Sequence, residues 1–290
     1  MSIPTLAMIP SGYKAKKVYS VLPTDGSGDL KFSRTTNGTR VNQNGLIETV
    51  AGDVPRLDYT DGGCPSLLLE GNSTNLITES EAFGNAYWTK SGATVTSGFS
   101  APSVDSPLGA FKLVEDTSNG LHWIESGSGS SLAGDLSSSI RVKADGISKI
   151  GIRESRFSGD YATFNLTTGT LIDNSAGDSV YIKSLANNWY EISVVADGDA
   201  NGHRFGIYLL DNSYTTGSPS SYSYTGDGTS GVYIFGAQLE QKSYATSYIK
   251  TSGTAISRTA DSASKSGISS LINSSEGVLY FEGGFLETAS

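Results

Sequence analysis

The sequence is poor in the residues on which many enzymes and disulfide-stabilised proteins depend. It contains one cysteine, Cys64, and two histidines, His122 and His203. A single cysteine cannot form an intrachain disulfide, so stability must come from burial or self-association. Two histidines leave few candidates for a histidine-rich metal site or a Ser-His-Asp triad, and no metalloprotease, P-loop or nucleophile-elbow motif is present. These absences predict that the chain is not an enzyme.

Basic charge and long apolar runs are lacking as well. Lys and Arg number 20 against 29 Asp and Glu, which gives a net charge of −9. An acidic chain repels phosphate backbones and anionic lipid, so we expect no nucleic-acid partner. No apolar run approaches the roughly 18 residues of a membrane-spanning helix. Residues 1–10 lack the basic and apolar segments of a secretory signal, so synthesis in a cytoplasm without membrane insertion is predicted.

What the sequence does have is glycine, 35 residues in all, between short segments of alternating polarity. No segment shows helical periodicity over three turns, and the alternation is typical of strands separated by turns. Residues 139–143 alternate strictly, which predicts a strand with one wet face. The fold class is therefore predicted to be all-β, a jelly-roll β-sandwich preceded by an extended N-terminal β region. Strands are expected at 110–114, 121–125, 139–143, 149–153, 161–165, 190–194, 204–209 and 231–240.

Three parts are predicted along the chain. They are an N-terminal arm or small β module (1–74), a jelly-roll domain (75–260), and a Ser-rich linker with the first strand of a further domain (261–290). In the first part, Asn44-Gly45 accepts the positive φ of a tight turn and predicts a hairpin between 39–42 and 45–48. Pro65-Ser66-Leu67-Leu68-Leu69-Glu70 is interpreted as a buried strand.

Three stretches carry a layout that resembles phage virion proteins of tail-fibre and lectin-like type. They are Ser33-Arg34-Thr35 through Glu48 with Pro55-Arg56-Leu57-Asp58-Tyr59; Pro65 through Glu70 with Thr74-Asn75-Leu76-Ile77 and Trp88-Thr89; and Val232 through Glu240 with Ala245-Thr246-Ser247-Tyr248-Ile249 and Ser257-Arg258-Thr259-Ala260-Asp261. Residues 75–261 also resemble carbohydrate-binding jelly-roll modules, which open with Asn-Leu and Trp-Thr and close with a Gln-Leu-Glu strand.

The resemblance implies a virion structural protein, assembled in the host cytoplasm. A tail fibre or receptor-binding component would attach to other virion proteins through its N-terminal region and display a sandwich that binds a host-surface glycan. Analogy with fibres suggests a homo-oligomer such as a trimer. A second lectin-like domain would begin near residue 276. Two alternatives stay open: a capsid decoration or head-fibre protein, and a polysaccharide-active enzyme or its accessory binding module, since glycoside hydrolysis needs only two facing carboxylates.

Aromatic side chains are the candidate sugar contacts, because the C–H groups of a sugar ring stack on a π surface. We select Trp88, Trp123, Tyr222 and Tyr224 as ligand-binding candidates. Each also has a structural interpretation, since large aromatic residues commonly pack in a core or at its rim. For Trp189, which opens a strand, core packing is the prediction.

A single segment has the spacing of a metal site. Asp197, Asp199 and Asn201 stand at positions 1, 3 and 5 of a Ca²⁺ loop, and Gly202 takes the glycine position. Position 12 is Tyr208 rather than a bidentate Glu, and strands flank the loop. The segment is therefore either a Ca²⁺ site or a polar hairpin turn, and no other cofactor is predicted.

Overall fold

The computed structural model describes most of the chain as strands and turns. The described residues are 5–9, 12–127, 129, 132–155, 160–175, 179–197, 203–272, 275, 276, 278 and 280–284. They form two compact units, the first within residues 1–73 and 257–285 and the second within residues 74–256. The described helices are single 3₁₀ turns: η1 (Ala186–Asn188), η2 (Pro219–Ser221) and η3 (Ser269–Leu271). None of the helices in this part of the chain is long and apolar enough to cross a membrane.

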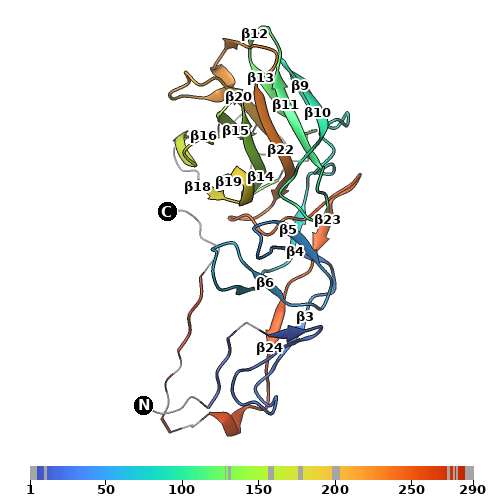
Figure 1. The fold of residues 1–290 in the computed structure, drawn as a ribbon, viewed down its shortest axis with the longest axis vertical. Helices are drawn as coiled ribbons and strands as arrows, with labels where there is room; N and C mark the ends of the chain where they lie inside the picture. Colours follow the sequence, from blue (N-terminus) through green and yellow to red (C-terminus); the bar gives the residue numbers. More distant parts are fainter. Residues whose placement is uncertain are drawn as a thin grey trace. The chain divides into compact units, whose positions relative to one another are not determined.

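Two six-stranded antiparallel sheets make up most of the second unit (Figure 1). One sheet has the order β10 (Ala93–Phe99), β11 (Ala110–Glu115), β22 (Gly231–Glu240), β14 (Asp135–Asp145), β19 (Tyr190–Asp197) and β18 (Ser179–Ser184). The other has the order β17 (Thr170–Asn174), β16 (Tyr161–Asn165), β15 (Lys149–Ser155), β20 (His203–Leu210), β13 (His122–Glu125) and β9 (Thr89–Ser91). A short ribbon joins β12 (Asn119–Gly120) to β21 (Tyr224–Thr225). All eight predicted strands of this region are present, which confirms the all-β class.

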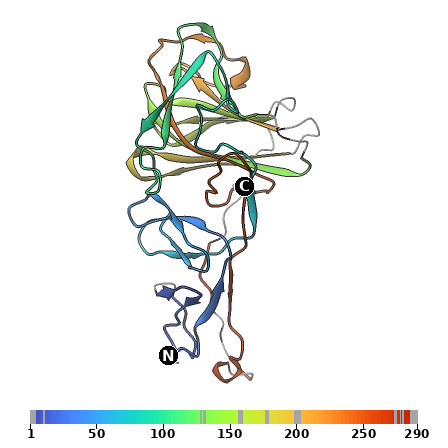
Figure 2. The same ribbon diagram turned by 90° about the vertical axis from the view of Figure 1, so that its right-hand side faces the viewer.

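An apolar core lies between the two sheets. Ile140 and Val232 from one sheet and Ile150 and Ile207 from the other are completely buried and belong to one contiguous cluster. Residues along a strand point alternately to the two faces of a sheet, so one face of each sheet supplies this core. The two layers can be followed in Figure 2. Trp189 is buried as predicted, with 2 % of its surface exposed.

The predicted wet face of β14 is wrong. Arg141 is 1 % exposed, and Ser139 is equally buried. The Arg141 guanidinium donates to the Gly236 carbonyl at 3.0 Å and lies 5.1 Å from the centre of the Tyr248 ring. The segment 241–251 therefore covers the outer face of this sheet. Strand periodicity identified the two faces of β14 correctly but carried no information about a later segment folding over one of them.

Polar side chains fix that covering segment. Gln238 accepts a hydrogen bond from the Ile249 amide at 2.6 Å, and Glu240 accepts one from the Thr246 amide at 2.8 Å. Asn75 donates to the carbonyls of Ala237 and Ile249 and is completely buried. These residues belong to the stretches that carried the family resemblance, and their contacts are internal.

The first unit consists of short sheets. One has the order β1 (Tyr13–Lys14), β2 (Lys17–Val18), β3 (Leu30–Ser33) and β24 (Ser262–Ser264). Two hairpins follow, β4 (Gly38–Val41) with β5 (Ile47–Val50), and β6 (Arg56–Asp58) with β7 (Ser66–Leu68). The chain passes between the units near β8 (Ser73–Asn75) and β23 (Ile256–Arg258). The β4–β5 hairpin confirms the prediction at Asn44-Gly45.

The predicted buried strand at 65–70 is partly wrong. A strand exists over Ser66–Leu68, but Ser66 is exposed and Leu69 is 48 % exposed. Glu70 is the buried member of the stretch. The reason is an ion network in the interior of the unit, to which Glu70 contributes its carboxylate.

Five charged side chains form that network: Arg34, Arg56, Glu70, Arg258 and Asp261. Each is at most 1 % exposed. Arg34 Nη1 donates to Asp261 Oδ1 at 2.9 Å, and Arg56 Nη1 lies 2.8 Å from Glu70 Oε2. Arg56 Nη2 also bonds Asp261 Oδ2, and Arg258 Nη2 lies 3.2 Å from Glu70 Oε2. The interior of the first unit is therefore held by charge as well as by apolar contact.

The division of the chain differs from the predicted one at its C-terminal end. The first boundary falls at 73/74, beside the predicted 74/75. Residues 257–285, in contrast, belong to the first unit, because Arg258 and Asp261 join its ion network and β24 pairs with β3. Residues 278 and 280–284 form no strand, although one was predicted at 277–285.

Candidate functional site

The outer face of the β13–β20 pair carries aromatic and charged side chains next to one another. The apolar residues of β20 pack in the core, so Arg204, Gly206 and Tyr208 between them face outward. In β13 the core residue is Ile124, so Trp123 and Glu125 face outward in the same way. Alternation along two neighbouring strands thus brings these five positions onto one face of one sheet.

The register places these side chains in contact. Trp123 pairs with Tyr208 across the strands, and Glu125 pairs with Gly206. The Trp123 and Tyr208 ring centroids are 6.2 Å apart, and Tyr208 Oη donates a hydrogen bond to Glu125 Oε1 at 2.8 Å. Arg204 Nη1 lies 3.6 Å from Glu125 Oε2. An aromatic pair therefore adjoins a carboxylate and a guanidinium.

Gly206 makes room for this arrangement. A β-carbon at this position would lie 3.0 Å from Glu125 Cγ and 3.1 Å from Tyr208 Cε2. Such distances are shorter than ordinary van der Waals contact, so a larger residue would push both side chains away. The absence of a side chain at 206 lets Glu125 and Tyr208 lie across the strand and meet.

The environment keeps the Tyr208 hydroxyl protonated. Burial raises the pKa of Tyr208 to about 12, and the negative charge of Glu125 adds to the rise, whereas Arg153 on the neighbouring strand opposes it. The phenol is therefore a hydrogen-bond donor throughout the physiological pH range. Its donation to Glu125 fixes the orientation of that carboxylate on the sheet.

The loop between β20 and β21 covers the part of this face that lies beside Gly151. A β-carbon on Gly151 would come within 2.5 Å of Pro219, so the loop lies directly on the strand. Thr216 Oγ1 and the Gly217 amide both donate to the Asp173 carboxylate of β17, at 2.6 and 2.8 Å. Trp123, outside this cover, stays partly exposed. The accessible side chains of this face are therefore Trp123, Glu125 and Arg204, whereas Tyr208 is 3 % exposed.

Of the four aromatic candidates, Trp123 lies on this face and Trp88 does not. Trp88 is 2 % exposed, and its indole N–H donates to the Glu79 carbonyl at 2.9 Å. Its ring packs against Phe83 at 4.8 Å between centroids. The prediction of Trp88 as a ligand contact is wrong, because the ring belongs to the sandwich core and has no free face.

Tyr222 and Tyr224 lie in a second aromatic group. Tyr224 is 8 % exposed, its hydroxyl donates to Glu115 at 2.6 Å, and its ring lies 4.5 Å from His122. Tyr222 is partly exposed and donates to Asp211 at 2.7 Å. Both hydroxyls are therefore already used by internal carboxylates. The burial of Tyr224 contradicts its prediction as a ligand contact.

The predicted metal loop falls largely outside the described residues. Asp197 ends β19, but its side chain and the whole of Asp199 and Asn201 lie outside the described part of the chain. The Ca²⁺ interpretation therefore stays a prediction. Among the residues that the structure does describe, no group of three His, Cys, Asp or Glu side chains is placed to hold a metal ion.

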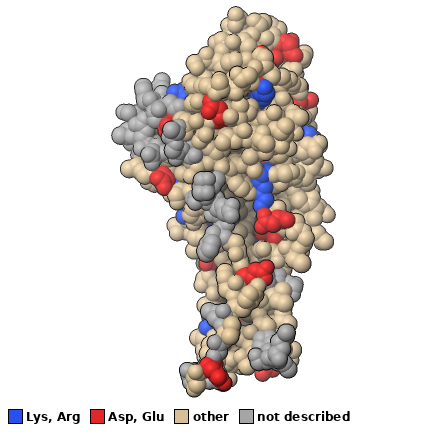
Figure 3. All heavy atoms as spheres, turned by 90° about the vertical axis from the view of Figure 1, so that its left-hand side faces the viewer, with Lys and Arg blue, Asp and Glu red and all other residues tan. Residues whose placement is uncertain are grey.

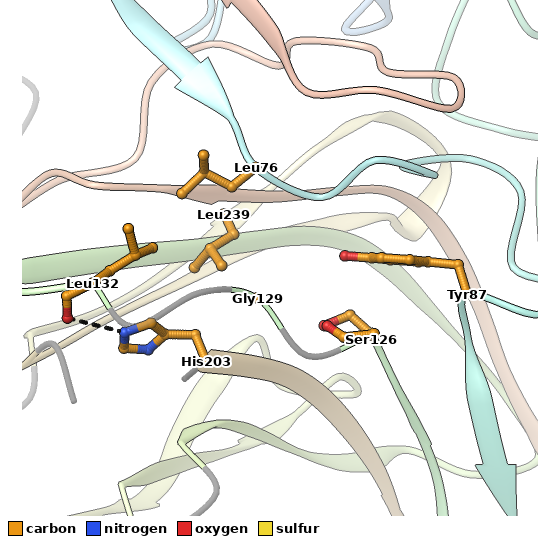
Figure 4. A pocket seen from close by; sticks show the side chains of 8 residues that line it. Leu76, Tyr87, Ser126, Gly129, Leu132, His203 and Leu239 are labelled. Atoms are coloured by element: carbon orange, nitrogen blue, oxygen red, sulfur yellow. Dashed lines mark hydrogen bonds between the residues drawn. The ribbon is translucent and has the colours of Figure 1, made fainter. Parts of the chain in front are cut away.

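A small cavity of about 270 Å³ lies elsewhere in the second unit (Figure 4). Its walls are mainly apolar, with three leucines and Tyr87. The polar residue His203 uses Nε2 to contact the Leu132 carbonyl at 3.2 Å. Ser126 accepts a hydrogen bond from the Phe205 amide at 3.1 Å. The lining residues are Leu76, Tyr87, Ser126, Gly127, Gly129, Leu132, His203 and Leu239.

Sequence reasoning missed Tyr208, Glu125 and Arg204. The segment 204–209 was interpreted only for its apolar face, although the same alternation predicts that Arg204 and Tyr208 share the opposite face. Glu125 ends a short strand two residues after Trp123, so its position on the same face was also available from the period of two. The pairing of β13 with β20 was the missing information, because it joins positions 83 residues apart.

No model of a protein family matches the sequence, and no curated protein matches it.

Proposed function

We propose that this chain is a phage virion protein whose sandwich binds a host-surface glycan, as a tail-fibre or receptor-binding component. The observation that carries the proposal is the grouping of the partly exposed Trp123, Glu125 and Arg204 on one sheet, with the buried Tyr208 packed against Trp123 and bonded to Glu125. A partly exposed indole offers a stacking surface, and a carboxylate beside a guanidinium offers an acceptor and donors for sugar hydroxyls. No large basic patch is visible on the face drawn in Figure 3.

The strand order of the sandwich supports a jelly roll, which carbohydrate-binding modules share. In an eight-stranded jelly roll, one sheet orders its strands first, eighth, third, sixth, and the other second, seventh, fourth, fifth. Taking β11, β13, β14, β15, β16, β19, β20 and β22 as these eight strands gives both orders. β9, β10, β17 and β18 then extend the edges. On this assignment the proposed binding face lies on the sheet that holds the second and seventh strands.

The first unit is the proposed attachment module, which contacts other virion proteins. What supports an association role is apolar surface. Val278 is 95 % exposed, and Tyr280 and Phe281 are each 79 % exposed. Exposed apolar groups of this kind favour contacts with another chain. Self-association into a homo-oligomer is part of the proposal and is measured directly by light scattering of the purified full chain.

Binding to an array of bacterial-surface and plant glycans tests the function. Wild type is expected to bind a defined subset, and Trp123→Ala is expected to lose that binding while retaining the wild-type circular dichroism spectrum. Tyr19→Ala is the matched control, because Tyr19 is a 38 % exposed aromatic residue of the first unit. Unchanged binding by Trp123→Ala, or no glycan bound by wild type, would overturn the proposal.

Electron microscopy of antibody-labelled particles from the source phage tests the location. Label at the tail supports the receptor-binding proposal. Label spread over the head would replace it with a decoration or head-fibre role, and unlabelled particles would replace it with a free carbohydrate-active module.

A further inference from the structure

Arg204 holds a guanidinium whose hydrogen-bonding capacity is largely unused within the described residues. Its only ion pair there is with Glu125, and the 3.6 Å separation is longer than a hydrogen bond. Its Nε is buried and meets no acceptor in the same part of the chain. The side chain nevertheless keeps 25 % of its surface exposed. A planar group with five N–H donors is thus held at the edge of the proposed binding face with few acceptors.

Glu125 is occupied in a way that Arg204 is not. Its Oε1 accepts from the Tyr208 hydroxyl at 2.8 Å, which fixes the carboxylate over Gly206. Arg153, the second guanidinium on this face, interacts with the same hydroxyl. Glu125 therefore meets the Tyr208 hydroxyl at hydrogen-bond distance and Arg204 at a longer distance.

We propose that Arg204 selects a glycan that bears a carboxylate, such as a uronic or sialic acid, which it binds through paired N–H donors while the sugar ring stacks on Trp123. Guanidinium groups match the geometry of carboxylates better than that of single hydroxyls, and the charge-assisted bonds are stronger than neutral ones. A neutral sugar would offer the exposed part of the guanidinium only uncharged acceptors, whose hydrogen bonds are weaker. This inference rests on the proposed glycan-binding function and adds the chemical class of the glycan.

The test uses acidic polysaccharides and their own neutral forms. Full-length protein is titrated with polygalacturonate, alginate, hyaluronan and polysialic acid fragments, and with the same fragments after reduction of the carboxyl groups to alcohols. The reduced forms keep the sugar rings that stack on Trp123 and remove the carboxylate alone. Wild type is expected to bind at least one acidic form roughly tenfold or more tightly than its reduced form, the ratio expected for one charge-assisted contact.

Variants assign that preference to a residue. Arg204→Gln is expected to reduce the affinity for the acidic form by about tenfold while changing the affinity for the reduced form less than about twofold. Lys112→Gln is the matched control, because it removes one positive charge from β11 in the other sheet and should preserve the preference. Trp123→Ala is expected to weaken both forms.

The outcomes separate the inference from the function. Equal binding of acidic and reduced forms, or binding of neutral array glycans alone, overturns the carboxylate selectivity. If Trp123→Ala still abolishes the observed glycan binding, the proposed glycan-binding function stands. An acidic preference that survives Arg204→Gln overturns the role of Arg204. Failure of wild type to bind any acidic, reduced or array glycan overturns the proposed function together with the inference.

Discussion

The two units of this protein are stabilised by different means. The sandwich has a contiguous apolar core from two six-stranded sheets, with Trp88 and Trp189 among its largest buried side chains. The first unit has short strands, and arginines and carboxylates fill much of its interior. Small modules bury too little apolar area to be stable on that basis alone. A buried charge is stable only when its partners lie at bonding distance, so each residue of the network depends on the others.

Residues from the three stretches singled out in the sequence take part in the contacts that stabilise each unit. Arg34, Arg56, Glu70, Arg258 and Asp261 come from all three stretches and meet inside the first unit. The third stretch also contains Gln238 and Glu240, which fix the segment covering β14. These three stretches thus carry contacts inside each of the two units. The proposed binding face, in contrast, lies mainly outside those stretches.

The largest expected effect comes from breaking the ion network. Arg56→Met removes a guanidinium that contacts both Glu70 and Asp261 and leaves buried carboxylates undercompensated. Unfolding of the first unit is expected to become easier by about 3–5 kcal/mol. Native-state hydrogen exchange of peptides from β3 to β7 measures this. Tryptophan fluorescence follows the sandwich separately, because all three tryptophans lie in the second unit.

Arg40→Met is the control for that variant. Arg40 forms an ion pair with Glu48 in the same unit, but the two side chains are 17 % and 25 % exposed. Because solvent still reaches this pair, its loss should cost about 1 kcal/mol, less than the loss of a member of the buried network. Equal effects of the two substitutions would show that burial of the network is not what stabilises the first unit.

A smaller or similar effect is expected from a cavity in the sandwich. Ile207→Ala removes completely buried methyl groups from the core and is expected to lower sandwich stability by about 2–5 kcal/mol. Urea unfolding followed by tryptophan fluorescence measures it. Leu171→Ala, at a 42 % exposed position of the same unit, should change stability by less than about 0.5 kcal/mol. If Ile207→Ala instead lost hydrogen-exchange protection in the first unit and kept it in the sandwich, the assignment of the apolar core to sandwich stability would be wrong.

An alkaline titration sharpens the account of the binding face. Because Tyr208 holds its proton up to a pKa of about 12 in the folded protein and near 10 in an unfolded chain, its contribution to stability is complete below pH 10 and is lost as the pH rises toward 12. Glu125→Gln removes a negative charge and should lower that pKa, leaving it above 10 because the ring stays buried. Ultraviolet difference spectra of wild type and Tyr208→Phe isolate this phenol, and an unchanged titration in Glu125→Gln contradicts the contact.

The smallest expected effect is the loss of stability that the first unit undergoes at low pH when Asp29 is protonated. The Ser20 amide, and then Lys17, hold the pKa of Asp29 below its usual 3.8. The carboxylate therefore stabilises the fold above about pH 4, and this contribution disappears as the pH falls through the lowered pKa. Asp29→Asn should be less stable than wild type at neutral pH, with the difference shrinking in acid. Exchange rates of β2 and β3 amides at both pH values measure it, and a difference independent of pH would exclude the charge as its source.

The sequence was sufficient to predict where the strands lie, but not which strands pair or which later segments bury their outer faces. All-β class, the β4–β5 hairpin and the sandwich strands followed from periods of two and from turn residues. The burial of Arg141 and Glu70 did not, because each depends on a segment that returns from far along the chain. Trp88 was misassigned for the same reason, since exposure is a tertiary property. Trp123 was selected from the sequence and lies partly exposed on the candidate face, and its role as a ligand contact stays a prediction. Its neighbours Tyr208 and Arg204 required the register between β13 and β20.

The most direct test of the account is hydrogen exchange of the full chain with and without polygalacturonate oligosaccharides, or with whichever array glycan binds more tightly. The account predicts slower exchange in β13 and β20, no change in peptides of the first unit, and loss of the protection in Trp123→Ala. Protection confined to the first unit, or protection in β13 and β20 that persists in Trp123→Ala, would contradict it.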